Sequence, residues 1–289
     1  MKKPENVKKY SQSREVWQRF CRNKLAVFGL VLFLVIVLLA IFADVIAPHG
    51  IELEMNMADR LQPPSGAHWF GTDNFGRDVF ARIVHGARYS LVVGLVAVAV
   101  GITIGGVLGA VAGFFGNLVD TAIMWIMDTL MCIPYMLLVL SVVAALGANL
   151  QNVVIAIVIS TIPIYTRVIR SSVLTVVGMD YIEAARSCGT PDRFIILRHV
   201  LPNAIGPVIV QATMSVGTTI ISAASTSFLG MGVQPPTPEW GAMLSESKNF
   251  ITSQPYLVLF PGVAIGLTVL ALNLMGDGLR DALDPKLKD

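Results

Sequence analysis

Few side chains in this sequence are grouped as catalysis or metal binding would require. The 289 residues include four histidines and three cysteines, isolated from one another, and they form no CxxC or HExxH pattern. Those spacings are typical of zinc sites built from one stretch of sequence. No glycine is followed by lysine, so the GxxxxGK[ST] loop that binds nucleotide phosphates is also absent. We therefore expect no catalytic residue, no metal site and no cofactor on this chain, and we do not expect an enzyme.

The most informative charged segment is EAARSCGTPDRFIILRHVLPN, residues 183 to 203, which lies between two long apolar runs. It holds one glutamate, one aspartate and three arginines, and Gly-Thr-Pro breaks it in the middle. A folded, charged segment between apolar runs suits binding to another surface. It is the part of the chain that bears most on function.

Two short helices are predicted around this break. Asp180 can cap the first helix, and Glu183 three residues later completes a capping box. Gly189 is a natural left-handed stop. Thr190 can cap the second helix, with Pro191 at its first position, where a missing N–H costs nothing.

The second helix carries an apolar stripe that a helix of this size cannot bury by itself in water. Pro202 should prevent this helix from running on unbroken into the next apolar run. The helix pair either packs back on the rest of the protein or docks into a partner. We favour docking, because both ends are fixed by apolar runs that would receive any push on the pair. The stripe consists of Phe194, Ile195, Leu197 and Leu201.

Most of the remaining chain is apolar enough to lie in lipid. Hydrophobic residues make up 54% of the sequence and charged residues 14%, against about 25% charged in a typical soluble domain. A membrane crossing needs roughly 20 mostly apolar residues. We predict an all-α integral membrane protein with six transmembrane helices, of which the fourth is the weakest because Pro163 interrupts it. The runs are 25–46, 91–115, 118–147, 153–165, 205–231 and 256–275.

The placement of basic residues predicts the orientation. Eight of the 21 lysines and arginines precede Leu25, so the N-terminus should be cytoplasmic, and six crossings return the C-terminus to the same side. Localisation in the inner (cytoplasmic) membrane, in contact with lipid, is expected. The predicted organisation is a basic cytoplasmic tail with a short interfacial helix (1–24), a first transmembrane helix (25–47), an extracytoplasmic segment (48–90), a core of five transmembrane helices (91–275) with a cytoplasmic loop (172–202), and a cytoplasmic tail (276–289).

Four glycines at steps of four lie on the second apolar run. In lipid this spacing allows two helix backbones to approach closely, so the glycines indicate a packing face. Flexibility during gating is the alternative interpretation. The four are Gly101, Gly105, Gly109 and Gly113.

Asp120 and Asp128 lie on the third apolar run, where an ionisable group is a candidate for function. Residues 131–147 alone would make about 25 Å of helix, with Pro134 bending it. Both aspartates could therefore lie near the cytoplasmic face. We favour an interfacial salt bridge or cap, and a buried role in a transport pathway is the alternative.

Two further segments are candidate landing surfaces for a soluble partner outside the cell. Phe75, Val79, Phe80 and the two residues Ile83 and Val84 suggest an amphipathic helix lying on the outer surface. The proline-rich stretch 234–240 should form a stiff outer loop. Simple capping of the helix bundle explains either segment equally well.

The segment from Glu183 to Pro202 resembles the EAA loop of ABC importer permeases. That pattern is EAA, three residues, Gly, nine residues, Ile, one residue and Leu-Pro. The chain matches it everywhere except the Ile, where it has His199. The residues that the resemblance assigns to ATPase coupling are Glu183, Ala184, Ala185, Gly189, Asp192, Arg193, Phe194, Leu201 and Pro202.

Three more segments resemble the second permease subunit of dipeptide, oligopeptide and nickel importers. They are HWFGTDNFGRDVFARIVHGARYSL (68–91), FLGMGVQPPTPEWGAML (228–244) and NLMGDGLRDALDPKL (273–287). The resemblance implies a type I ABC importer permease that forms half of a translocation pathway, most simply for di- or oligopeptides. It also implies a related second permease, two cytoplasmic ATPases that hold ATP and magnesium, and an extracytoplasmic solute-binding protein.

Other functions are less well supported. Within the same class, the cargo could be nickel or a nickel chelate, glutathione or an opine-like molecule. A passive channel would need no ATPase and no loop of this form, and an intramembrane enzyme would need paired reactive groups at one depth. No nucleic-acid partner is expected. The role of the GDGLRDALDP stretch near the C-terminus is not explained by the sequence.

Overall fold

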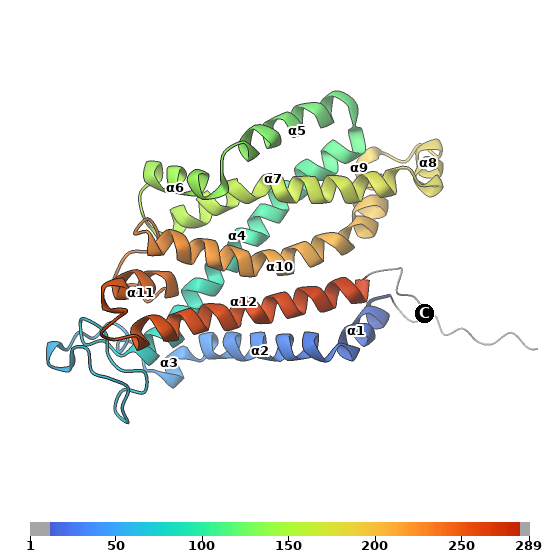
Figure 1. The fold of residues 1–289 in the computed structure, drawn as a ribbon. Coiled ribbons are helices and arrows are strands. Elements are labelled where there is room, and N and C mark those ends of the chain that lie inside the picture. Colours follow the sequence, from blue (N-terminus) through green and yellow to red (C-terminus); the bar gives the residue numbers. More distant parts are fainter. Residues whose placement is uncertain (1–11, 284–289) are drawn as a thin grey trace, which may run out of the picture.

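The computed structural model describes residues 12–283, and their regular elements are all helical. Long helices lie side by side, with α4 crossing behind the others (Figure 1). This confirms the all-α prediction. The helices are α1 (Gln12–Arg22), α2 (Lys24–Ile41), α3 (Ala43–Ile46), α4 (Val79–Phe115), α5 (Asn117–Met131), α6 (Tyr135–Leu146), α7 (Leu150–Val177), α8 (Asp180–Ser187), α9 (Asp192–Ile195), α10 (Leu201–Phe228), α11 (Trp240–Ser247) and α12 (Tyr256–Leu283), with short 3₁₀ turns at Met57–Asp59 and Lys248–Phe250.

Five helices are long and apolar enough to cross a membrane singly: α2, α4, α7, the run from α9 through α10, and α12. The third predicted crossing is instead a pair, because α5 and α6 meet at 86°. The predicted bend at Pro134 is confirmed, but it breaks the helix, so residues 131–147 do not form one continuous stretch. With the pair counted as one span, the described chain has up to six crossings, as predicted. Pro134 cannot donate a backbone hydrogen bond and disfavours helical geometry in Ile133, so the helix stops there and restarts at Tyr135.

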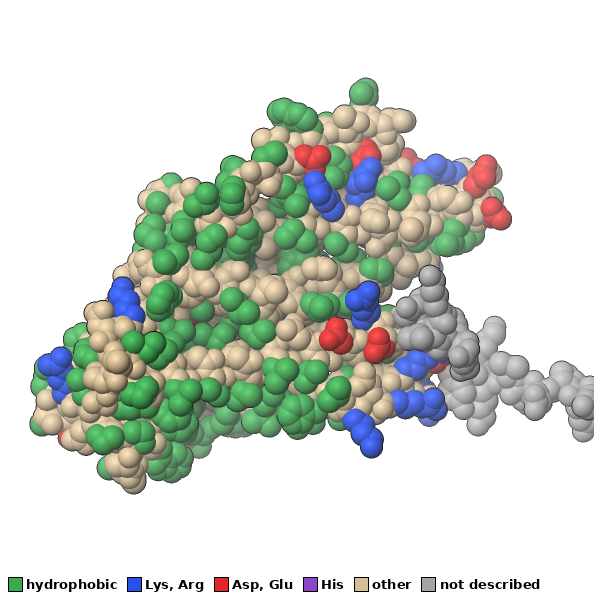
Figure 2. Space-filling model, viewed as in Figure 1, with side chains coloured by type: hydrophobic (Ala, Val, Ile, Leu, Met, Phe, Trp, Pro, Cys, Tyr) green, Lys and Arg blue, Asp and Glu red, His purple; other side chains and the backbone are tan. Residues whose placement is uncertain are grey.

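The two ends of the bundle differ in what they carry. α8 and α9 lie at one end, together with α1 and the last turn of α12, and the loop of residues 47–78 and α11 lie at the other (Figure 1). Most charged side chains of the visible face lie over its α8 half and a few lie at the opposite end, with hydrophobic and other uncharged atoms between them (Figure 2). Both ends of the described chain therefore lie at the α8 end, as an even number of crossings requires.

Three predicted boundaries fall inside helices. α4 begins at Val79, so the last part of the predicted outer segment belongs to a long helix, and the separate surface helix around Phe80 does not exist. α7 continues to Val177, beyond the predicted start of the loop at residue 172. α12 continues to Leu283, so the described part of the predicted C-terminal tail is helical. In that tail Gly278 lies against Ala26 of α2, which ties it to the N-terminal helices.

Two arginines at the start of α4 and just before it find partners inside the protein. Arg77 and Arg82 are almost fully buried, and both donate hydrogen bonds to Glu246 of α11, at 3.0 and 2.8 Å. Arg77 also pairs with Asp73, at 2.6 Å. Buried arginines are tolerated when they are paired in this way. This network fastens the outer loop to α4 and α11.

The four glycines of α4 lie against α7 along its length. A Cβ atom added to Gly109 would lie 2.5 Å from the Thr166 carbonyl oxygen, and one added to Gly105 would lie 3.0 Å from the Ile162 carbonyl oxygen. One added to Gly101 would meet the Tyr165 ring, and one added to Gly113 would meet Val173 and the Arg170 carbonyl. The two backbones are therefore too close for any side chain between them.

Gly109→Ala should destabilise the protein, because its methyl group meets backbone that cannot rotate away. We expect a loss of about 1–3 kcal/mol, as for other overpacked cores, measured as a lower thermal unfolding midpoint in detergent. Gly106→Ala is the matched control: its Cβ would meet the flexible end of Ile169 at 3.2 Å, and the midpoint should change little. Equal midpoints for the two variants would show that the α4–α7 contact is not tight.

Candidate functional site: an exposed helix pair and a polar cavity

The helix pair predicted from the charged segment is present, with its break where expected. Gly189 separates α8 from α9 and has φ +72°, which confirms the left-handed stop. The predicted caps are displaced. Asp180 is the first residue of α8 rather than its cap, and Pro191 rather than Thr190 precedes α9. Neither helix start has a side-chain cap, since Met179 and Pro191 occupy the capping positions and have no side-chain acceptor.

The second helix does not stop before Pro202. A π-helical turn (Ile196–Val200) joins α9 to α10, and Pro202 lies in the first turn of α10. The expected interruption is therefore wrong. The wider turn supplies the room that the proline ring needs, and the missing N–H falls where helix geometry changes. As a result, α9, the π turn and α10 form one continuous helical segment from Asp192 to Phe228.

The inner faces of both short helices are anchored on the bundle. Ile182 of α8, Ile195 of α9 and Val200 of the π turn are fully buried. They form one apolar cluster with Val173 of α7 and Phe114 of α4. Because burial of each large aliphatic side chain contributes about 1.5–3 kcal/mol, the pair is firmly packed on the bundle.

The outer faces remain open. Phe194 is 48% exposed and Leu197 66% exposed, so the predicted apolar stripe is split between an anchored and a free side. Seven of the nine residues assigned to coupling are exposed, including Gly189 at the break between the helices, and the other two are half-buried. The other exposed ones are Glu183, Ala184, Asp192, Arg193, Phe194 and Pro202, and the half-buried ones are Ala185 and Leu201.

The two aspartates of α5 pair with arginines of α7. Asp120 accepts two hydrogen bonds from the Arg170 guanidinium, and Asp128 accepts one from Arg167. Two-bond arginine–carboxylate pairs fix geometry as well as charge. The pairs hold the broken α5–α6 crossing against α7, and neither aspartate lines the cavity described next.

A cavity of about 240 Å³, lined mostly by side chains that carry a hydroxyl or amide group, lies between α6, α7 and α10. Gln211 and Ser215 of α10 face it and are joined by a hydrogen bond of 3.1 Å. The Tyr165 hydroxyl is buried close to Ser215 and makes no hydrogen bond of normal geometry to a described residue. Hydroxyl and amide groups without charge suit hydrogen bonding to a polar solute. The lining is Tyr135, Thr161, Ile164, Tyr165, Gln211, Ser215, Thr218, Thr219 and Ser222.

Comparison with known proteins gives this geometry a context. Residues 105–289 match the family model described as binding-protein-dependent transport system inner membrane component. Residues 11–64 match the N-terminal transmembrane domain of oligopeptide transport permease C. The chain belongs to the family of binding-protein-dependent transport permeases. The resemblance drawn from the EAA segment is thereby confirmed.

The chain is similar along most of its length to permeases of peptide and glutathione transport systems. The chain is 49% identical over 275 residues to the dipeptide transport system permease protein DppC of Alkalihalophilus pseudofirmus, covering 95% of this chain and 90% of the relative. It is 46% identical to the glutathione transport system permease protein GsiD of Pectobacterium atrosepticum, covering 95% of this chain and 91% of the relative. GsiD of Escherichia coli O6:K15:H31 is also 46% identical, over 99% of this chain and 94% of the relative.

Solved structures support the fold. An inward-facing structure of the MetNI methionine ABC transporter in its native crystal form superposes with a TM-score of 0.59 at 20% identity, covering 71% of this chain and 97% of the matched chain. A selenomethionine-soaked form gives the same TM-score over 70% and 96%. The predicted type I importer permease fold is confirmed.

Sequence reasoning missed the cavity of this permease, although a signal was present. Gln211, Ser215, Thr219 and Ser222 follow one another at steps of four, four and three along an otherwise apolar run. That spacing places them on one helix face. Sequence reasoning also placed Trp240 on an exposed outer loop, whereas it is buried and donates to the Ile83 carbonyl at 3.0 Å.

Proposed function

We propose that this chain is one of two permease subunits of an ABC importer, forms half of the pathway for di- or oligopeptides, and is driven through α8 and α9. The observation that carries the proposal is the exposed helix pair, which is anchored on α7 before it and continuous with α10 after it. A partner that moves this pair moves two long helices of the bundle.

The family and the exposed helix pair support the partners that an importer of this kind would have. A related second permease would complete the pathway, two cytoplasmic ATPases would dock on the helix pairs, and an extracytoplasmic binding protein would deliver cargo at the α11 end. ATP and magnesium would be held by the ATPases, because this sequence has no phosphate-binding loop. Both termini would then be cytoplasmic, and this subunit would not itself be an enzyme.

Transport requires that the helix pair bind differently to the two states of the ATPases. A ligand or partner can shift a conformational equilibrium only by its difference in affinity for the two states. ATP binding would close the ATPases and move the groove that holds α8 and α9. The connected helices α7 and α10, which together line most of the cavity, would then open it to alternate sides.

A peptide is the cargo that the cavity and the relatives favour. The named relatives act on a dipeptide and on glutathione, and the latter is itself a small peptide. Peptide groups would find donors and acceptors in the hydroxyl and amide lining. This lining has no imidazole, thiolate or carboxylate among its described residues, so it is a poor fit for bare nickel. Glutathione is the second candidate, and competition with a nickel chelate or an opine tests the others.

Gly189→Arg should abolish ATP-driven uptake of a labelled dipeptide while the protein stays in the membrane. A side chain at φ +72° costs about 1–2 kcal/mol, and a bulky cation would face the ATPase. Gly189→Asn tests the backbone effect, because asparagine tolerates this conformation, and it should keep most of the uptake. Uptake should be measured in intact cells with and without depletion of ATP.

The same cells provide the control for docking. Gly66→Arg places an identical side chain in open space in the outer loop, and ATPase subunits should still copurify with it. Normal uptake by Gly189→Arg would exclude coupling through this helix pair, and uptake that persists without ATP would indicate a passive channel.

Tyr165→Phe tests the cavity as part of the pathway. Removing a buried hydroxyl that makes no hydrogen bond of normal geometry should leave the thermal midpoint unchanged or slightly higher. Uptake should nevertheless fall, with a higher KM, if cargo supplies the missing hydrogen bond. Wild-type uptake kinetics in a stable Tyr165→Phe protein would show that cargo does not use this hydroxyl.

A further inference from the structure

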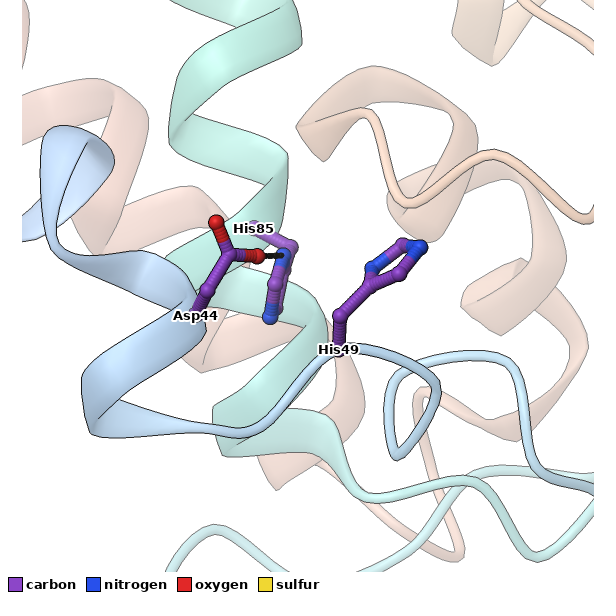
Figure 3. A group of neighbouring side chains, drawn as sticks. All are labelled: Asp44, His49 and His85. Carbon is purple, nitrogen blue, oxygen red and sulfur yellow. Dashed lines mark ion pairs between the residues drawn. The ribbon is translucent and has the colours of Figure 1, made fainter.

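Asp44, His49 and His85 are far apart in the sequence and come together at the end of the bundle opposite α8. Asp44 lies on α3, His49 on the loop that follows it, and His85 on α4, as Figure 3 shows. One ligand atom from each residue lies within 4.8 Å of the other two. The isolation of the histidines in the sequence, on which the expectation of no metal site rested, does not hold in the fold.

The His85 ring is held as metal-ligating histidines are held, and His49 lies beside it. Nε2 of His85 lies 2.8 Å from the Ala47 carbonyl oxygen, which can only accept, so Nε2 carries the proton and Nδ1 keeps its lone pair. Nδ1 of His49 lies 2.9 Å from a carboxylate oxygen of Glu52. That nitrogen is the one nearer to Asp44 and His85, and Nε2 points away from them (Figure 3), so His49 would bind an ion only after its ring turns from Glu52. A carbonyl or carboxylate behind the ring is the usual way in which a metal-binding histidine is oriented.

The third ligand faces the free nitrogen of His85. Oδ1 of Asp44 lies 3.9 Å from Nδ1 of His85 (Figure 3). Arg88 donates to both Asp44 oxygens, at 2.8 and 3.2 Å, and also to the carbonyls at the end of α2. A carboxylate oxygen can accept more than one bond, so Arg88 orients the Asp44 carboxylate and still leaves it able to bind a metal ion.

We propose that Asp44, His49 and His85 bind a divalent transition-metal ion of the zinc class. Two imidazoles and one carboxylate form a three-ligand set that leaves positions open to water. Nitrogen ligands favour zinc, cobalt or nickel over magnesium and calcium, which prefer oxygen. The proposal does not depend on the proposed function.

Small movements complete the geometry. Ligand atoms around tetrahedral zinc are roughly 3.3 Å apart, given zinc–ligand distances near 2.0 Å. His85 is buried and fixed, whereas the His49 side chain is 72% exposed and can turn from Glu52 toward His85. Glu52 is almost fully buried behind the rings, and its negative charge partly offsets the positive charge of Arg88.

A bound ion would link three elements that the chain connects only loosely. It would join α3 and the loop after it to α4, beside the place where Arg88 ties the end of α2 to the same helix. An ion that binds only the folded protein raises its stability in proportion to the logarithm of the free metal concentration. The site would thus be a structural metal site at the end of the bundle opposite α8, separate from the cavity.

The test is a titration of the full chain, purified in detergent with any subunits that accompany it. The affinity tag should contain no histidine, and the sample should be stripped with EDTA. Cobalt(II) is the first probe, because a site of this kind gives it a visible absorption band. We expect saturable binding that zinc displaces and that excess calcium or magnesium does not. Zinc should also raise the thermal unfolding midpoint.

Two variants locate the ion. His49→Ala changes an exposed side chain and should weaken cobalt binding about tenfold or more. His85→Gln keeps an N–H donor for Ala47 while removing the ligand nitrogen, and it should have the same effect. His68→Gln is the matched control, because His68 pairs with Asp78 away from the cluster, at 2.9 Å, and binding should be unchanged.

Three results would overturn the proposal. They are the absence of saturable cobalt or zinc binding by the wild-type protein, unchanged binding in both His49→Ala and His85→Gln, and displacement of cobalt by calcium as readily as by zinc. None of these results would bear on the role of α8 and α9.

Discussion

The close contact of α4 with α7 is the constraint on which the rest of the structure depends. Glycine steps on α4 bring the two backbones together, so that α7 cannot shift without α4. α7 then carries three further features. Its arginines hold α5, its Tyr165 enters the polar cavity, and its C-terminal end leads into α8. Force applied at α8 therefore reaches the cavity through a rigid helix pair, because packed interiors transmit strain rather than absorb it.

The two ends of the bundle are built for different tasks. At the α8 end, side chains such as Phe194 stay exposed, although the helices that carry them are firmly anchored. At the opposite end, buried ion pairs around Arg77 fasten the outer loop to α4 and α11. A fixed rim at the α11 end and an exposed helix pair at the α8 end suit a subunit that receives cargo at one end and is driven at the other.

Features encoded within a few residues could be predicted from the sequence, and features that depend on folding could not. The length of the apolar runs predicted the membrane crossings. Gly189 predicted the break between α8 and α9, because a left-handed turn favours glycine. The sharp break before Tyr135 and the π turn before Pro202 depend on how neighbouring helices accommodate a proline. The cavity joins three helices, and the cluster at His85 joins residues from three elements, so short-range spacing reveals neither.

Cross-linking from Cys188 tests the role of the helix pair most directly. Cys188 is exposed beside Gly189, and Cys21→Ser with Cys132→Ser leaves it as the single thiol. In inside-out vesicles we expect an adduct with an ATPase subunit whose yield changes when a non-hydrolysable ATP analogue is added, and none from Gly66→Cys in a background without the native cysteines. Absence of an ATPase adduct from Cys188, or one that forms equally well from Gly66→Cys, would contradict coupling through α8 and α9.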